Sequence, residues 1–84
     1  MTTMRLDKFL KVSRLIKRRT VANEVSDMGR VFVNGKPAKP AKQIKENDII
    51  EIEYATRTTK AKVLKVPTGN VSIQQAQELY EIVE

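Results

Sequence analysis

The stretch Gly29-Arg30-Val31-Phe32-Val33-Asn34-Gly35 marks the point where the chain changes from helical to strand periodicity. Its centre is β-branched and aromatic, which favours an extended strand. The strand runs directly into an Asn-Gly pair, a strong hairpin signal because a type I′ turn needs positive φ at both central residues. The sequence therefore predicts a strand over residues 30–33, a tight turn, and a brief return strand that Pro37 and Pro40 interrupt.

Upstream of this stretch, the sequence predicts two short helices joined by a basic turn. Residues 5–12 carry Leu6, Phe9 and Leu10 at helical spacing, with basic side chains on the other side. This pattern breaks after residue 13, and residues 14–19 are predicted to form the turn. The second helix is expected to start at Thr20 as its N-cap and to end at Gly29. Its predicted apolar stripe consists of Val21, Val25 and Met28.

Downstream, a strand is predicted over Ile49–Tyr54 and another over residues 59–66, followed by a breaker at Pro67-Thr68-Gly69-Asn70. A last helix is then expected, with Ser72 and Gln75 as its capping box. Its predicted apolar stripe consists of Ile73, Ala76, Leu79, Tyr80 and Val83. This order predicts an α+β fold in which two N-terminal helices pack on a small, mainly antiparallel sheet. We expect one domain over residues 4–66 and a C-terminal helical extension, residues 67–84, packed on it.

The composition excludes most enzyme chemistry. The chain has 84 residues and contains no Cys, His or Trp. Disulfides, zinc sites built from Cys or His, thiol nucleophiles and Ser-His-Asp triads are therefore ruled out. A chain this short buries only about 60% of its unfolded surface and has little room for a substrate pocket. We expect a protein that is not an enzyme and that uses no cofactor or metal.

The charge is large and unevenly placed. Sixteen Lys and Arg residues against ten Asp and Glu give a net charge of +6. Residues 1–45 hold twelve basic and three acidic side chains, a local charge of +9, whereas the rest of the chain carries −3. Such asymmetry is typical of a protein with one face that meets a polyanion. The longest apolar run is Val31-Phe32-Val33, and the N-terminus is charged from Arg5 on, so we expect a cytoplasmic protein without a membrane partner.

Several separate sequence pieces, in the right order, resemble the S4 RNA-binding domain. They are Arg5–Leu10, Arg14, Lys17–Thr20, the Gly29–Gly35 stretch and Asn47-Asp48. The usual pattern is R-L-D-x-x-L, then R, S/T-R-x-x-A, G-x-V-x-V-N-G, and G-D before a strand. Asn47 replaces the usual Gly, which is tolerable because Asn accepts positive φ. Thr20 follows the second arginine instead of preceding it, which leaves open whether Arg18 or Arg19 faces the ligand.

The resemblance has implications for fold, partners and site residues. Only about thirty residues follow the motif, too few for a catalytic domain, and the run Met4–Thr20 is similar to the RqcP family of stand-alone S4 proteins. That family acts in bacterial ribosome-associated quality control and is related to the fifteen-kilodalton heat-shock protein. The implied partners are the large (50S) ribosomal subunit, 23S rRNA, peptidyl-tRNA and the tailing factor RqcH, with the protein acting as a monomer. The expected RNA-binding residues are Arg5, Lys8, Arg14, Lys17, Arg18, Arg19, Asn34 and Lys36.

The implied function is to hold P-site tRNA while stalled nascent chains receive C-terminal alanine tails. With only two Phe and two Tyr, the chain offers no aromatic platform for bases, so we expect recognition of RNA through its backbone and shape.

Asp7 is interpreted as structural, stabilising the first helical turn or orienting an arginine. The residues assigned to the core are Leu6, Phe9, Leu10, Val21, Val25, Ile50 and Ile52.

Other functions are compatible with parts of this pattern. A heat-shock-type rescue factor for free large subunits with peptidyl-tRNA would share the site, and so would a large-subunit assembly factor. A small DNA-binding module would use the two helices as a helix-turn-helix, but Asn23, Glu24 and Asp27 make the second a poor recognition helix. A membrane-surface protein would need the short apolar face of the first helix, which the core requires.

Overall fold

The turn at Asn34 and Gly35 determines how the sheet begins. The computed structural model describes residues 3–54, 57–67 and 71–83. Both turn residues have positive φ, 53° for Asn34 and 82° for Gly35. The turn joins β2 (Val31–Val33) to β3 (Lys36–Pro37) in an antiparallel pair. The predicted tight hairpin and its brief return strand are therefore confirmed.

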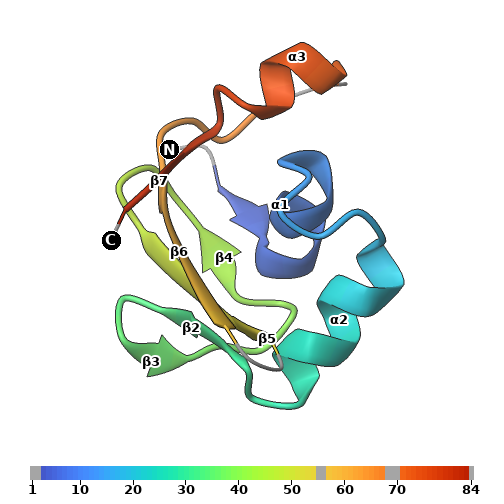
Figure 1. The fold of residues 1–84 in the computed structure, drawn as a ribbon, viewed down its shortest axis with the longest axis vertical. Coiled ribbons are helices and arrows are strands. Elements are labelled where there is room, and N and C mark those ends of the chain that lie inside the picture. Colours follow the sequence, from blue (N-terminus) through green and yellow to red (C-terminus); the bar gives the residue numbers. More distant parts are fainter. Residues whose placement is uncertain (1–2, 55–56, 68–70, 84) are drawn as a thin grey trace.

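An antiparallel five-stranded sheet in the order β3-β2-β5-β6-β7 forms the centre of the fold (Figure 1). The strands that extend the hairpin are β5 (Ile49–Tyr54), β6 (Arg57–Val63) and β7 (Tyr80–Ile82). Their register places Ile50 opposite both Val33 and Ala61, and all three side chains are buried. Because strand side chains alternate between faces, this register directs one apolar face of the sheet toward the core.

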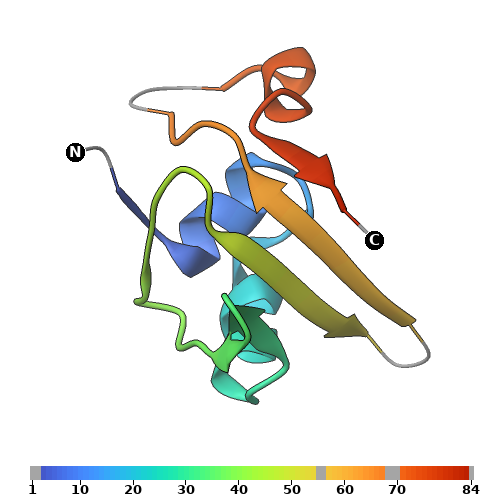
Figure 2. The ribbon, with the colours of Figure 1, turned by 90° about the vertical axis from the view of Figure 1, so that its left-hand side faces the viewer.

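Two helices cover that face, α1 (Leu6–Val12) and α2 (Arg19–Asp27), as Figure 1 and Figure 2 show. Leu6, Phe9 and Leu10 are fully buried, as the helical spacing predicts. The structure thus confirms the α+β fold, with two N-terminal helices on a mainly antiparallel sheet.

The second helix differs from its prediction at both ends. Its N-cap is Arg18 in extended conformation, and Thr20 is already helical. Arg18 therefore stands where the S4 pattern usually has Ser or Thr, and its side chain makes no capping hydrogen bond. At the other end Gly29, with φ of 78°, terminates the helix as expected, but Met28 is 65% exposed.

Small residues, not the predicted stripe, make the closest contact between α2 and the core. Ala22 and Ser26 are fully buried, whereas Val21 and Val25 are half-buried and pack at its margin. The Ser26 hydroxyl donates to the Ala22 carbonyl oxygen at 2.8 Å, so its burial leaves no polar group unpaired. Small side chains allow a helix to pack close to the core. A prediction based on large apolar residues does not identify them.

A second, two-stranded sheet holds the start of α1. It pairs β1 (Met4–Arg5) with β4 (Gln43–Ile44), so Arg5, which was predicted to be the first residue of the helix, lies in a short strand before it. The Leu6 N–H also donates to the Lys42 carbonyl oxygen at 2.8 Å. These bonds fix the position of Arg5 at the entrance to α1.

The C-terminal segment contains a shorter helix than predicted. The capping box of Ser72 and Gln75 is present, but α3 covers only Ile73–Ala76. Tyr80 and its neighbours form β7 on the edge of β6, so the prediction of a helical stripe reaching Val83 is wrong. The exposed β6 edge offers unpaired backbone groups, and pairing with them outweighs extension of a short helix.

Two further sequence expectations concern the breaker before the last helix and membrane-spanning segments. Of the predicted breaker only Pro67 is described, and Thr68, Gly69 and Asn70 lie outside the described residues. Within the described ranges, no helix is long and apolar enough to cross a membrane.

Candidate nucleic-acid interface

A buried carboxylate, Asp7, joins the first turns of both helices. Its side chain lies in the first turn of α1, and the residue is only 2% exposed. Its oxygens accept hydrogen bonds from four groups. The donors are the Lys8 backbone N–H at 2.8 Å, Arg5 Nε at 3.2 Å, Asn23 Nδ2 at 3.3 Å and Arg19 Nε at 3.5 Å. The charge of the carboxylate is thus compensated by these donors. In return, Asp7 holds the guanidinium groups of Arg5 and Arg19 in place.

The environment of Asp7 favours its charged form. Burial alone raises the pKa of this carboxyl group, because a low dielectric disfavours charge. The hydrogen bond from Asn23, the charge of Arg19, the Lys8 N–H and the charge of Arg5 act in the opposite direction and together hold the pKa of Asp7 below its ordinary value. Asp7 is therefore a stable anion at neutral pH, as its predicted structural role requires.

The two arginines are held at one edge and exposed at the other. The side chains of Arg5 and Arg19 are 46% and 48% exposed, whereas that of Asp7 is 3% exposed. Arg5 uses Nε and one terminal nitrogen on Asp7, and Arg19 uses Nε. The exposed part of each guanidinium remains suited to phosphate oxygens, which match its planar fork of donors.

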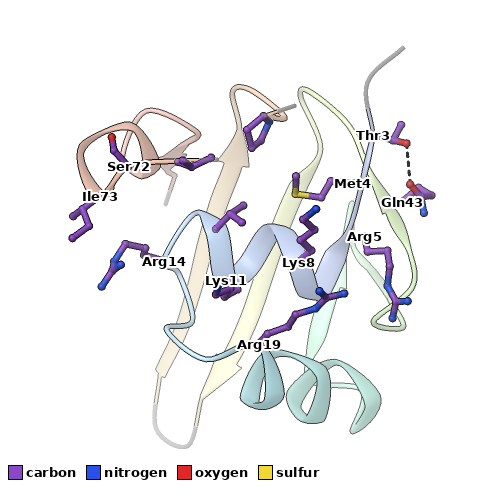
Figure 3. Close-up of a pocket in the computed structure, with 13 residues that line it drawn as sticks. Thr3, Met4, Arg5, Lys8, Lys11, Arg14, Arg19, Gln43, Ser72 and Ile73 are labelled. Carbon is purple, nitrogen blue, oxygen red and sulfur yellow. Dashed lines mark hydrogen bonds between the residues drawn. The ribbon is translucent and has the colours of Figure 1, made fainter. Parts of the chain in front are cut away.

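An open groove of about 1000 Å³ runs along α1 beside these arginines (Figure 3). Its basic lining residues are Arg5, Lys8, Lys11, Arg14 and Arg19. Among the residues of the described ranges that line it, none is acidic. Arg14 lies just past the end of α1 and has a left-handed backbone, with φ of 63°. Its side chain lines the groove beyond the end of the helix. A groove of this kind attracts a polyanion.

The groove brings together half of the predicted site residues. Arg5, Lys8, Arg14 and Arg19 line it, and Lys17 and Arg18 are exposed on the adjoining turn without lining it. Lys11 lines it as well, although it is not among the predicted site residues. Its spacing of three residues from Lys8 was the available signal, because residues i and i+3 share one helix face.

The remaining two predicted residues lie at the β2–β3 turn. Asn34 and Lys36 line a separate hollow, together with Lys39 and Lys42. The Asn34 side chain is engaged within the protein: Nδ2 donates to Asp48 Oδ1 at 3.1 Å, and Oδ1 accepts from the Ile49 N–H at 3.0 Å. This residue therefore holds the hairpin to β5, while the nearby lysines supply the positive charge.

The buried carboxylates of the described residues are engaged in hydrogen bonds within the protein. They are Asp7 and Asp48, and both accept several hydrogen bonds. Asp48 is held by Asn34 and by the Lys45 N–H at 3.0 Å. The lowered pKa of Asp7 makes its carboxylate a poor general base.

Comparison with known proteins agrees with this geometry. The S4 domain family model matches residues 4–50. The chain is 49% identical over 83 residues to the "RQC P-site tRNA stabilizing factor" of Listeria monocytogenes, covering 99% of this chain and 89% of that protein. It is 49% identical over 80 residues to the protein of the same name from Streptococcus pneumoniae, covering 95% of this chain and 90% of that one.

The fold is also similar to that of a solved structure. The solved structure is that of heat shock protein 15 from Vibrio cholerae, a trimeric structure, with a TM-score of 0.86 and 28% sequence identity. The match covers 98% of this chain and 83% of the Vibrio protein.

Proposed function

This chain belongs to the S4-domain family of RQC P-site tRNA stabilizing factors, and on that premise we propose that it is a non-enzymatic RNA-binding factor of ribosome-associated quality control. The observation that carries the proposal is the pair of arginines held by Asp7 beside the basic groove of α1. Arginines fixed in this way lose little conformational entropy when they bind phosphate.

The particle to which it binds is an obstructed large (50S) ribosomal subunit that still carries peptidyl-tRNA. In this proposal Arg5 and Arg19 contact 23S rRNA, and the same protein also contacts the tRNA. The basic row along α1 supports contact with RNA backbone, because phosphates can be bound in succession along one helix face. The protein acts in the cytoplasm, where ribosomes work.

The protein acts by differential affinity and does no chemistry. A factor that binds the P-site arrangement more tightly than other arrangements stabilises the P-site arrangement by that difference in free energy. After each alanine is added to a stalled chain, the factor would favour the translocated tRNA. RqcH, the tailing factor, works on the same particle. The carboxylates of Asp7 and Asp48 accept hydrogen bonds within the protein, which supports a binding role alone.

A second candidate function is rescue of free large subunits in the manner of heat-shock protein 15. The structural similarity to the Vibrio protein favours it, as does 34% identity to a heat shock protein 15 homologue from Aeromonas salmonicida. Such a factor would bind the same particle without a tailing partner. The two functions therefore differ in whether alanine tailing depends on this protein.

Co-sedimentation with purified ribosomal particles tests the proposed function. We expect the protein to sediment with free large subunits that carry P-site peptidyl-tRNA, and much less with empty subunits or whole ribosomes. Equal binding to all three particles, or to none, would contradict the proposal. Preference for immature subunits without tRNA would instead indicate a role in assembly.

Light scattering of the protein alone tests the monomeric state, since the Vibrio relative forms a trimeric structure.

A further inference from the structure

The groove beside α1 has a second wall, and that wall is apolar. Pro67, Val71 and Ile73, from the segment that leads into and begins α3, line the groove together with Lys8 and Lys11 of α1. Ile73 is 63% exposed, among the most exposed large apolar side chains of the described chain. Figure 3 shows Ile73 and Ser72 at the same end of the groove as Arg14, with Arg5 and Gln43 at the opposite end.

This wall is held in place by the fold. Val66 is buried just before it, and Val71 packs against the core. The capping box of Ser72 and Gln75, with bonds of 3.2 Å in both directions, fixes the start of α3. Beyond α3, Leu79 is buried, and its carbonyl oxygen accepts from the Leu64 N–H at 2.8 Å. Ile73 is therefore presented to solvent on a fixed support, and the core does not account for its position.

The two walls together indicate the chemistry of a ligand. Lys11 and Arg14 offer positive charge on one side, and Val71 and Ile73 offer aliphatic surface on the other. An RNA strand carries both complementary parts, because its phosphates are anionic and the faces of its bases are apolar. Within a duplex those faces are stacked and inaccessible, so only an unpaired nucleotide exposes them.

We propose that the end of the groove between Arg14 and Ile73 holds the base of one unpaired nucleotide, whose flanking phosphates bind Lys11 and Arg14. This inference rests on the proposed function, since it assumes that the ligand of the groove is RNA. The volume of about 1000 Å³ is at the upper end of ordinary small-ligand sites and accommodates a nucleotide. Aliphatic packing has little base preference, so the groove selects unpaired over paired RNA without reading sequence.

An acidic amphipathic peptide is the other ligand that charge and polarity allow. A helical peptide would need an apolar stripe on the protein that continues over several helical turns. Here the strongly exposed Ile73 lies at one end of the groove, and the cations extend from Arg14 beside it to Arg5 at the other end (Figure 3). The longer basic surface therefore favours a nucleic acid strand.

The experiment compares two RNA hairpins that differ in one base. Both carry a single-nucleotide bulge; in one hairpin the bulged nucleotide is complete, and in the other it is abasic, so that sugar and phosphates are identical. Fluorescence anisotropy gives the affinity of each hairpin for the wild type, Ile73→Ser and Ile82→Ser. Ile82 is the matched control because it is 53% exposed on β7 and does not line the groove.

We expect the wild type and Ile82→Ser to bind the complete hairpin about fivefold more tightly than the abasic one, as partial burial of one aliphatic side chain implies. Ile73→Ser should bind both hairpins equally, at the level of the wild type with the abasic RNA. Comparing the two hairpins in the wild type and in Ile73→Ser isolates the contact between base and side chain from any general effect of the substitution.

The other outcomes overturn the inference in distinguishable ways. If the wild type binds both hairpins equally well, the base site is refuted while RNA binding stands. If it binds neither hairpin nor any other RNA, both the base site and the proposed function fail. Displacement of the RNA by an acidic amphipathic peptide, in the wild type but not in Ile73→Ser and without any base preference, would assign the apolar wall to a protein partner.

Discussion

The Nε of Arg19 lies 3.5 Å from the Oδ2 of Asp7, so the first residue of α2 is held against the first turn of α1. The same oxygen accepts from Asn23 Nδ2, one turn further along α2. A buried anion between two helix starts is compensated only while these donors are present. The interface and the packing of the helices therefore depend on the same carboxylate.

Replacement of Arg5 or Arg19 by Ala is expected to weaken binding to large subunits strongly while changing stability little. Each arginine side chain is about half exposed, and Asp7 keeps its other donors when one arginine is removed, so the loss should be close to the value for an exposed ion pair, about 0.2–1 kcal/mol. Pelleting assays and thermal melts measure the two effects. Arg57→Ala is the control, because Arg57 is an exposed arginine on β6 outside the groove. A large fall in melting temperature would show instead that these arginines are structural.

Arg18→Ser is expected to stabilise the protein by about 1 kcal/mol, because it places a capping hydroxyl at a helix N-terminus that lacks a side-chain cap. Binding to large subunits should fall less than in Arg19→Ala, since Arg18 does not line the groove. Chemical denaturation and pelleting of the two variants in parallel test this. Equal loss of binding in both would place Arg18 at the RNA as well.

Acid should remove the stabilisation that Asp7 provides. Because its pKa is lowered in the folded protein, the unfolded state binds the proton more readily, and stability falls as the pH decreases. The contribution is complete above the ordinary carboxyl pKa of about 3.9 and disappears as the pH falls through the folded value.

Asp7→Asn isolates this contribution from those of the other carboxyl groups. At neutral pH we expect a loss of about 1–3 kcal/mol, since the part-buried hydrogen bonds of Arg5 and Asn23 lose a charged acceptor. The difference between the wild type and the variant should shrink in denaturant melts taken below the folded pKa of Asp7. A difference that stays constant with pH would mean that the charge of Asp7 does not stabilise the fold.

Binding to RNA should weaken steeply with salt. The logarithm of the affinity is expected to fall by about 0.7 to 0.9 per phosphate contacted for each tenfold increase in salt. Arg14→Ala should reduce this slope by the contribution of about one phosphate contact, because Arg14 lines the groove. Anisotropy titrations over a range of salt concentrations measure the slope, and a flat response would contradict contact with phosphates.

Local sequence signals predicted those parts of the fold that depend on local chemistry. The Asn34-Gly35 turn needs only positive φ, and Gly29 ends α2 for the same reason. Leu6, Phe9 and Leu10 mark the buried face of α1 by their spacing. In the site, the sequence pattern selected Arg5 and Arg19, which the structure brings together at Asp7.

What the sequence did not predict depends on contacts distant along the chain. Strands β1 and β4 have two residues each, too few to show any periodicity. Tyr80 fits a helical stripe, but the edge of β6 captures it as a strand. Ile73 was expected on the buried side of a helix, and because α3 ends at Ala76 it faces the groove instead.

The central claim is that the protein stabilises tRNA in the P site, and the lifetime of that tRNA tests it most directly. Labelled tRNA carrying a short peptide would be bound to purified large subunits, and its dissociation followed with the wild type, with Arg19→Ala, and without protein. Because coupling between two ligands is reciprocal, a protein that prefers the tRNA-loaded particle must raise the affinity of the tRNA by the same factor. We predict slower dissociation with the wild type and an intermediate rate with Arg19→Ala; an unchanged rate at saturating wild-type protein would contradict the claim.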